Sequence, residues 1–204
     1  MSAVQSACVR YNAEISAGSL MPLESKRIAA LLLSQPDESS WADAIEKQNI
    51  LQKKTPATAR RQATLIRKRL STLTPEAWQM IASRESEVAN QMLLAAAVKH
   101  SQLLGDFMLT VYALSQRRLE VALSVSDWHG YLAECAHRDA SVAGWTASTK
   151  LKLFQVIIRI LVEAKYLDGS RAMLMTPPSL HPDVRSYLRQ HHETYALDCL
   201  ERAQ

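Results

Sequence analysis

Residues 53–73 read KKTPATARRQATLIRKRLSTL, and this stretch predicts an amphipathic helix. Thr55 is a residue type that caps helices, and Pro56 suits the first helical position, where a missing N–H costs nothing. Apolar residues then recur at helical spacing and form one stripe, which consists of Ala59, Ala63, Ile66, Leu70 and Leu73. We expect this stripe to pack against the rest of the protein.

The opposite face of this helix is cationic. The sequence from Lys47 to Pro75 holds eight Lys or Arg and no Asp or Glu. A solvated surface helix is the ordinary explanation for a basic run, but such helices usually mix both signs of charge at i,i+4 spacing. The missing carboxylates therefore favour a polyanion as the partner of this face.

The composition indicates a helical, globular chain of one or two domains. Its 204 residues are 48% hydrophobic and include only five Gly, and strand-forming runs are few. The formal net charge of +4 is small, so the clustering of the cations is more informative than their sum.

The sequence also indicates a compartment. Cys8, Cys135 and Cys199 are odd in number and far apart, which is not a disulfide framework and fits a reducing cytosol. The first residues do not resemble a signal peptide, and no apolar run approaches the ~18 residues that span a bilayer. We expect a soluble, cytoplasmic protein that does not interact with a membrane.

Residues 1–74 are expected to form a basic module similar to a helix-turn-helix unit. Helical patterns cover residues 22–33, about 40–48 and 56–73, and the third of them is the basic helix. Three helices in this order are the layout of a helix-turn-helix unit. The connection over residues 49–55 is longer than the usual turn of about three or four residues.

Residues 75–118 are expected to form a helical bundle that connects the two ends of the chain. A short helix over residues 75–83 precedes a longer one from Ser86 to Leu104, which Gly105 is expected to break. We find no pattern of reactive or ligand-binding residues in this part.

Residues 119–204 are expected to form a winged-helix-like module. One helix is capped by Ser126 or Asp127, and the next, capped by Ser148 or Thr149, ends near Ala164. The dipeptide Asp168-Gly169 then predicts a hairpin turn. The fold class is therefore expected to be mainly α, with one short β-hairpin.

Two stretches of the sequence resemble a known family. They are ISAGSLMPLESKRIAALLL, residues 15–33, and WADAIEKQNILQKKTPATARRQATLIRKRL, residues 41–70. They resemble the N-terminal half of the BrxA family, small proteins of bacterial BREX phage-defence operons, and the length and tail of the chain also fit. The resemblance implies a non-enzymatic, DNA-binding accessory component that works beside a methyltransferase and other BREX proteins.

Both ends of the chain provide candidate contacts to double-stranded DNA. The candidates near the basic helix are Lys53, Lys54, Thr55, Thr58, Arg60, Arg61, Thr64, Arg67, Lys68 and Arg69. The candidates near the C-terminus are Lys150, Lys152 and Arg171. Residues early in a recognition helix reach base edges, and Arg61 is able to pair with a guanine at two points. The later cations suit phosphates, which position a protein without reading sequence, so we expect weak sequence preference.

Catalysis and metal binding have little support in the sequence. His129, Cys135 and His137 lie near one another, but the chain has no C-x-x-C motif and no tight Cys/His quartet. Phosphate-loop, zinc-protease and hydrolase motifs are absent. We expect no enzyme activity, no metal, no cofactor and no small-molecule substrate.

Two other functions remain open for the basic face. The protein is an assembly adaptor if the basic helix docks an acidic partner within the same BREX complex. It is an RNA-binding helical factor if structured RNA is preferred over duplex DNA. The small number of aromatic residues, none of them within the basic run, disfavours a platform that stacks single-stranded bases.

Overall fold

Helix α3 (Pro56–Leu70) forms where the sequence predicts the amphipathic helix. The structure, a computed structural model, describes residues 10–203, so Cys8 lies outside the described residues. The Thr55 hydroxyl accepts the Thr58 N–H at 3.2 Å, and Pro56 occupies the first turn, as expected. The apolar stripe is buried, from Ala59 to Leu73.

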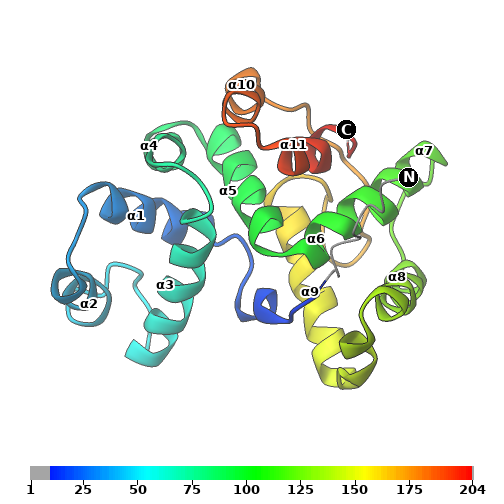
Figure 1. Ribbon diagram of the computed structural model, residues 1–204, viewed down its shortest axis with the longest axis horizontal. Coiled ribbons are helices and arrows are strands. Elements are labelled where there is room, and N and C mark those ends of the chain that lie inside the picture. Colours follow the sequence, from blue (N-terminus) through cyan, green and yellow to red (C-terminus); the bar gives the residue numbers. More distant parts are fainter. Residues whose placement is uncertain (1–9, 204) are drawn as a thin grey trace, which may run out of the picture.

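Helix α5 (Ser86–His100) lies between the N-terminal and the C-terminal helices, and the fold is mainly α (Figure 1). On the N-terminal side these elements are η1 (Glu14–Ala17), α1 (Pro22–Leu33), α2 (Glu38–Glu46) and α4 (Pro75–Ser83). The C-terminal side consists of α6 (Gln102–Phe107), the π-helical turn η2 (Met108–Tyr112), α7 (Ala113–Arg117), α8 (Val125–Arg138), η3 (Ala140–Gly144), α9 (Ala147–Glu163), α10 (Pro182–Gln190) and α11 (Thr194–Glu201).

The core is continuous from one end of the chain to the other. Helix α5 is buried on nearly all sides from Val88 to Val98, and it packs against α3, α4 and α11. A single cluster of buried side chains extends from Tyr11 to Ala203. The predicted parts of the chain therefore share one hydrophobic interior.

Gly105 does not break a helix, which corrects the sequence analysis. The break comes earlier, at Ser101, whose backbone is extended between α5 and α6. Gly105 lies inside α6, where a Cβ atom would stand 2.3 Å from the hydroxyl oxygen of Tyr195 on α11. Glycine is needed here because α11 packs close to α6, and not because the backbone turns.

Two helix caps also differ from the expected residues. Ser124 caps α8, and its side chain and that of Asp127 form a reciprocal capping box. Thr146 caps α9 by accepting the Thr149 N–H at 3.1 Å. Each helix therefore begins two or three residues earlier than predicted, because the first of several nearby capping residues takes that role.

The chain reverses direction after Asp168, where the sequence predicts a hairpin turn. Two isolated antiparallel bridges form there, Ala122 with Leu174 and Leu167 with Met175, and residues 10–203 contain no longer strand. The segment around Leu174 therefore lies between the segments around Ala122 and Leu167.

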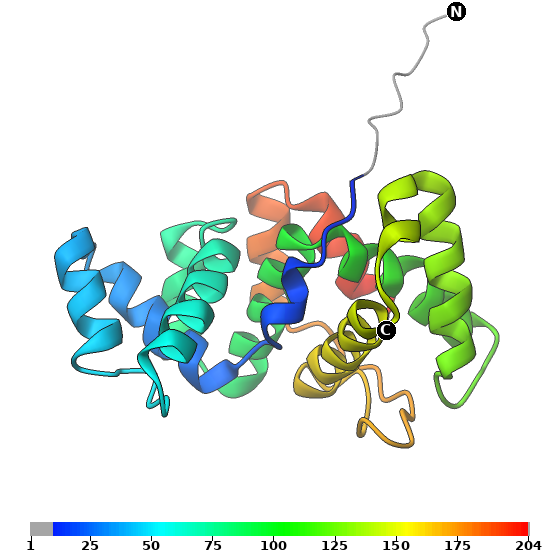
Figure 2. The ribbon, with the colours of Figure 1, turned by 90° about the horizontal axis from the view of Figure 1, so that it is seen from below.

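The N-terminal segment, residues 10–21, ties the two ends of the molecule together. The Tyr11 hydroxyl donates to Asp106 at 2.7 Å, and the Tyr11 N–H donates to Asp139 at 2.8 Å. Ile15 is completely buried. Seen from below, the segment runs between α3 and α9 (Figure 2). Among residues 10–203, no helix is both long and apolar enough to cross a bilayer.

Candidate nucleic-acid interface

A groove of about 780 Å³ separates the basic helix α3 from α9. Figures 1 and 2 show η1 between these two helices. The polar and charged residues that line the groove are Ser16, Ser19, Glu24, Lys53, Arg61, Gln62, Lys152, Gln155, Arg159, Glu163 and Ser170. The groove therefore joins residues from the two regions in which the sequence predicts DNA contacts.

Helix α9 forms its wall of the groove with one narrow polar stripe. Lys152, Gln155, Arg159 and Glu163 are spaced three or four residues apart, so they share one face of the helix. The rest of the helix is apolar and largely buried, including Ile157 and other branched residues. The polar stripe supplies the charged groups of this wall, and Phe154, Val156 and Ile158 of the same helix also line the groove.

Three cations in the groove have no partner among residues 10–203. Arg61 on α3 and Lys152 and Arg159 on α9 are exposed, and none of them forms an ion pair or hydrogen bond there. Their charges are therefore not neutralised from within the described part of the protein. The sequence analysis missed Arg159, although its place on the polar stripe of α9 was a signal for it.

The two carboxylates of the groove have partners of their own. Glu24 pairs with Lys53. Glu163 accepts the Ser19 hydroxyl at 2.8 Å and the Leu20 N–H at 2.7 Å, so it holds the N-terminal segment against α9. These bonds offset part of the negative charge that would oppose a polyanion.

Arg69 does not face outward, which corrects its assignment to the DNA-binding face. Its side chain is 4% exposed and donates to the carbonyl oxygens of Gly18 and Ser19. Burial lowers the pKa of Arg69 to about 10, and the charge of Glu163 opposes that shift. Arg69 lies on the buried side of α3 next to Leu70, so it holds the N-terminal segment and is not available to DNA.

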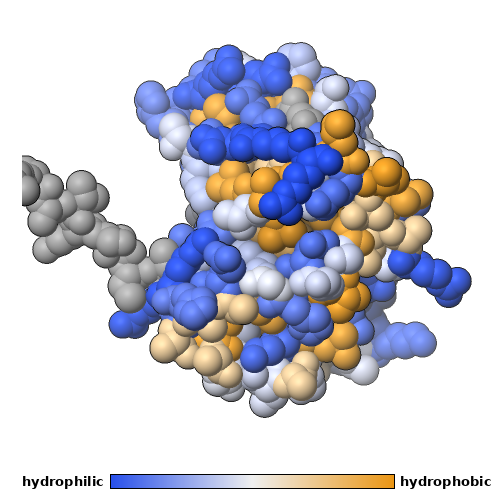
Figure 3. Space-filling view, turned by 90° about the vertical axis from the view of Figure 1, so that its right-hand side faces the viewer, coloured by the Kyte–Doolittle hydropathy of each residue, from blue (hydrophilic) through white to orange (hydrophobic). Residues whose placement is uncertain are grey.

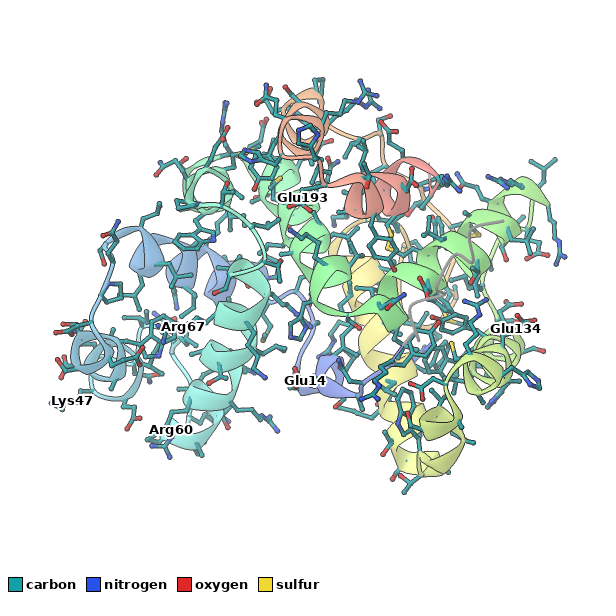
Figure 4. All side chains as sticks on the ribbon, viewed as in Figure 1. Glu14, Lys47, Arg60, Arg67, Glu134 and Glu193 are labelled. Atoms are coloured by element: carbon teal, nitrogen blue, oxygen red, sulfur yellow. The ribbon has the colours of Figure 1, made fainter. Side chains whose placement is uncertain are left out.

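The other cations near α3 find carboxylates on other elements. Arg60 pairs with Glu46 at 3.1 Å and Arg67 with Glu38 at 2.9 Å, both on α2. Figure 4 shows Arg60 and Arg67 along α3. Lys68 lies 3.3 Å from Glu14 on η1. The absence of acidic residues between Lys47 and Pro75 therefore does not leave these cations unpaired, because the fold brings carboxylates from elsewhere.

A smaller hollow of about 400 Å³ lies on the side of α3 that faces α2. It is lined by Trp41, Thr64, Arg67, Lys68 and Ser71. The Arg67 guanidinium lies 4.5 Å from the centre of the Trp41 ring, a cation–π contact that fixes it on α2. Here the charged groups serve to attach α2 to α3.

The remaining predicted contacts lie outside the large groove. Lys54 and Thr55 are exposed at the start of α3, where the Thr55 hydroxyl bonds that of Thr58 at 2.9 Å. Lys150 is half-buried at the start of α9, and Arg171 is exposed beside Ser170 of the groove. His129, Cys135 and His137 do not converge, since no three His, Cys, Asp or Glu of residues 10–203 are placed to hold a metal ion.

The comparisons with known proteins agree with one another over most of the chain. The BrxA family model matches residues 9–192. A BREX protein BrxA of Paramagnetospirillum magneticum is 42% identical over 94% of this chain and 96% of its own length. A BREX protein BrxA of Escherichia coli O9:H4 is 31% identical over 92% of this chain and 88% of its own length.

A solved structure with a sequence identity close to that of the first relative shares the fold. The crystal structure of an uncharacterized protein from Magnetospirillum magneticum has a TM-score of 0.86 and 40% sequence identity to this chain. The similarity covers 94% of this chain and 98% of that one. The family model and the relatives therefore show that this chain belongs to the BrxA family of BREX proteins.

Proposed function

We propose that this chain is a non-enzymatic component of a BREX phage-defence system that binds duplex DNA in the groove between α3 and α9. One observation supports this function best: Arg61, Lys152 and Arg159 converge on one groove, and none of them forms an ion pair or hydrogen bond among residues 10–203. Cations in this state neutralise phosphates and release counterions from the duplex. The protein acts in the cytoplasm.

Both ends of the chain contribute to this proposal. Helices α2 and α3 act as a helix-turn-helix-like unit, in which Arg61 is the residue for base edges and Thr58 and Thr64 assist it. Helices α8 and α9 and the reversal after Asp168 act as a winged-helix-like unit. That assignment is supported by the two antiparallel bridges, which join Ala122 to Leu174 and Leu167 to Met175. One duplex contacts both units because they share the groove.

The decisive experiment is a fluorescence anisotropy titration of the full chain with a short generic duplex at two salt concentrations. Two phosphate contacts, from Lys152 and Arg159, correspond to a slope of log K against log salt of about −1.8, or roughly 12-fold weaker binding from about 50 to 200 mM salt. We expect Arg61→Gln, Lys152→Gln and Arg159→Gln together to abolish most of this slope.

The matched control is Arg117→Gln, which removes an exposed arginine on α7 that does not line the groove. DNA binding that is equally reduced by the control and by the groove variants would contradict the assignment of the groove. Competition by an RNA hairpin of similar charge decides between duplex DNA and RNA. If neither nucleic acid binds at low salt, the groove serves an acidic protein and the adaptor function replaces this one.

A further inference from the structure

The surface beyond α7 has an unusual concentration of exposed apolar side chains. Seven large hydrophobic residues of the described chain are exposed, and five of them gather around the segment that joins α7 to α8. These five are Leu114, Leu119, Val121, Val125 and Leu174. Figure 3 turns this side of the molecule to the viewer and shows hydrophobic residues at the surface beside strongly hydrophilic ones. Exposed apolar residues that cluster mark an interaction site more often than single ones do.

Leu119 is the most exposed of these residues and also has an unfavourable backbone. It is 87% exposed, and its φ of 59° lies in the left-handed region, which favours Gly or Asn over a branched side chain. The folded chain gains little from a leucine at this position, because the side chain buries almost nothing. The left-handed backbone ends α7, where the Leu119 N–H donates to Gln116 and the Glu120 N–H donates to Ser115. The exposed leucine side chain, and not the backbone, therefore points to a contact with another molecule.

The same segment offers a free backbone edge. Leu123 donates to Met173 at 3.1 Å and Met175 donates to Val121 at 2.9 Å, and these bonds fix one side of the segment. Ala122, between them, pairs with Leu174 through a bridge but donates and accepts no backbone hydrogen bond within residues 10–203. In an antiparallel pair its N–H and C=O point away from the partner segment. They are therefore available to a further extended chain.

The charges beside this edge select the kind of chain that fits. Arg117 is exposed and forms no ion pair within the described part of the protein, and Arg118 lies 3.9 Å from Glu120. The cationic end of the edge therefore complements Asp or Glu.

We propose that the docking edge, residues 117–125, binds an extended segment of another protein of the same BREX operon. That segment pairs its backbone with Ala122, covers Leu119 and Val121 with its own large apolar side chains, and places acidic residues at Arg117 and Arg118. Strand addition of this kind takes its affinity from main-chain hydrogen bonds and its specificity from the side chains. The proposal does not depend on DNA binding, because none of these residues lines the groove.

The test uses the full chain and each of the other proteins of the operon, purified separately and treated with nuclease. We expect one of them to bind the wild-type chain, and Leu119→Asn to weaken that binding at least tenfold. Because Asn tolerates the left-handed conformation, the thermal midpoint of Leu119→Asn should equal or exceed that of the wild type. Ala122→Pro should weaken binding as well, since proline removes the free N–H without breaking a hydrogen bond of the folded chain.

Two matched variants separate this edge from other surfaces. Leu151→Asn changes an exposed leucine on α9, and Arg61→Gln removes a cation of the groove; both should leave the protein partner bound with unchanged affinity. Arg117→Glu should weaken it and leave duplex binding intact. The proposal is overturned if no operon protein binds, if binding survives Leu119→Asn and Ala122→Pro, or if light scattering shows a dimer of this chain that these variants dissociate.

Discussion

Single residues hold the two walls of the groove at a fixed separation. Glu163 at the end of α9 and Arg69 on α3 both bind the backbone around Ser19. The Glu163 carboxylate accepts the Leu20 N–H, and the Arg69 guanidinium donates to the carbonyl oxygen of Ser19. The N-terminal segment is thus bound from both sides by opposite charges. A change at either residue should loosen the connection between α3 and α9.

We expect Glu163→Gln to lower the free energy of unfolding by about 1–3 kcal/mol, because the neutral amide cannot accept the hydroxyl and N–H bonds of Ser19 and Leu20 as the carboxylate does. Chemical denaturation measured by circular dichroism gives this value. The control is Glu134→Gln on the exposed face of α8 (Figure 4), which should change stability by less than about 0.5 kcal/mol. Equal effects of the two substitutions would show that Glu163 is no more than a surface carboxylate.

His100 should make stability depend on pH. Burial, together with the nearby charge of Arg69, lowers the pKa of His100 in the folded protein, and the carboxylate of Glu14 at 3.3 Å opposes this shift. The unfolded chain therefore takes up this proton at a higher pH than the folded one. The contribution of neutral His100 to the free energy of unfolding is complete above about pH 6.5 and is lost as the pH falls below that value.

The measurement is the free energy of unfolding at about pH 7.5 and about pH 5.5, for the wild type and for His100→Gln. We expect the wild type to lose stability over this interval and the variant to lose less. A decline of the same size in both proteins would assign the pH dependence to other groups.

At the scale of elements, the start of α3 offers a direct test of its cap. Thr55→Ala removes the side chain that accepts the Thr58 N–H and should destabilise the protein by about 1 kcal/mol. Thr64→Ala on the exposed face of the same helix forms the matched control, because it breaks no hydrogen bond within the described residues and places a better helix former there. Thermal unfolding followed at 222 nm (the usual helix signal) compares the two, and a Thr55 variant as stable as the Thr64 variant would contradict the role of the cap.

Local sequence signals predicted most of the helices, but they did not indicate which cations form ion pairs. The bounds of α1 and the cap of α3 follow from adjacent residues, a proline and a threonine that act within one helical turn. The pairs of Arg60 and Arg67 with α2, and of Lys68 with η1, join residues that only tertiary packing brings together. Charge along a sequence therefore indicated which helix is basic, but the fold decides which of its cations are free.

The same reasoning explains what was missed in the groove. Arg159 shares the polar stripe of α9 with Lys152, and this pattern was a signal for it, but a stripe of this kind is equally typical of a solvated helix face. Its importance appears only when Arg61 of α3 is seen across the groove. Gly105 was misread for a related reason, because the close approach of Tyr195 from α11 is not visible in the neighbouring sequence.

At the scale of the whole molecule, the continuous core predicts one cooperative unfolding transition. One buried cluster reaches from Tyr11 to Ala203, and the N-terminal segment is bonded to α6, α9 and the residue that follows α8. We expect the amides of α3 and of α9 to exchange their hydrogens with the same free energy under native conditions. Exchange from α3 at a distinctly lower free energy would instead make residues 1–74 a separate folding unit.

The position of the N-terminal segment has a consequence for protein synthesis. Residues 10–21 are made before nearly all of their partners, since Asp139 follows Tyr11 by 128 positions and Glu163 follows Ser19 by 144. Its bonds to Arg69 on α3 are able to form early, but those to Asp139 and Glu163 must wait until α8 and α9 have been made. The groove between α3 and α9 is thus assembled only after α9 has been translated, long after α3.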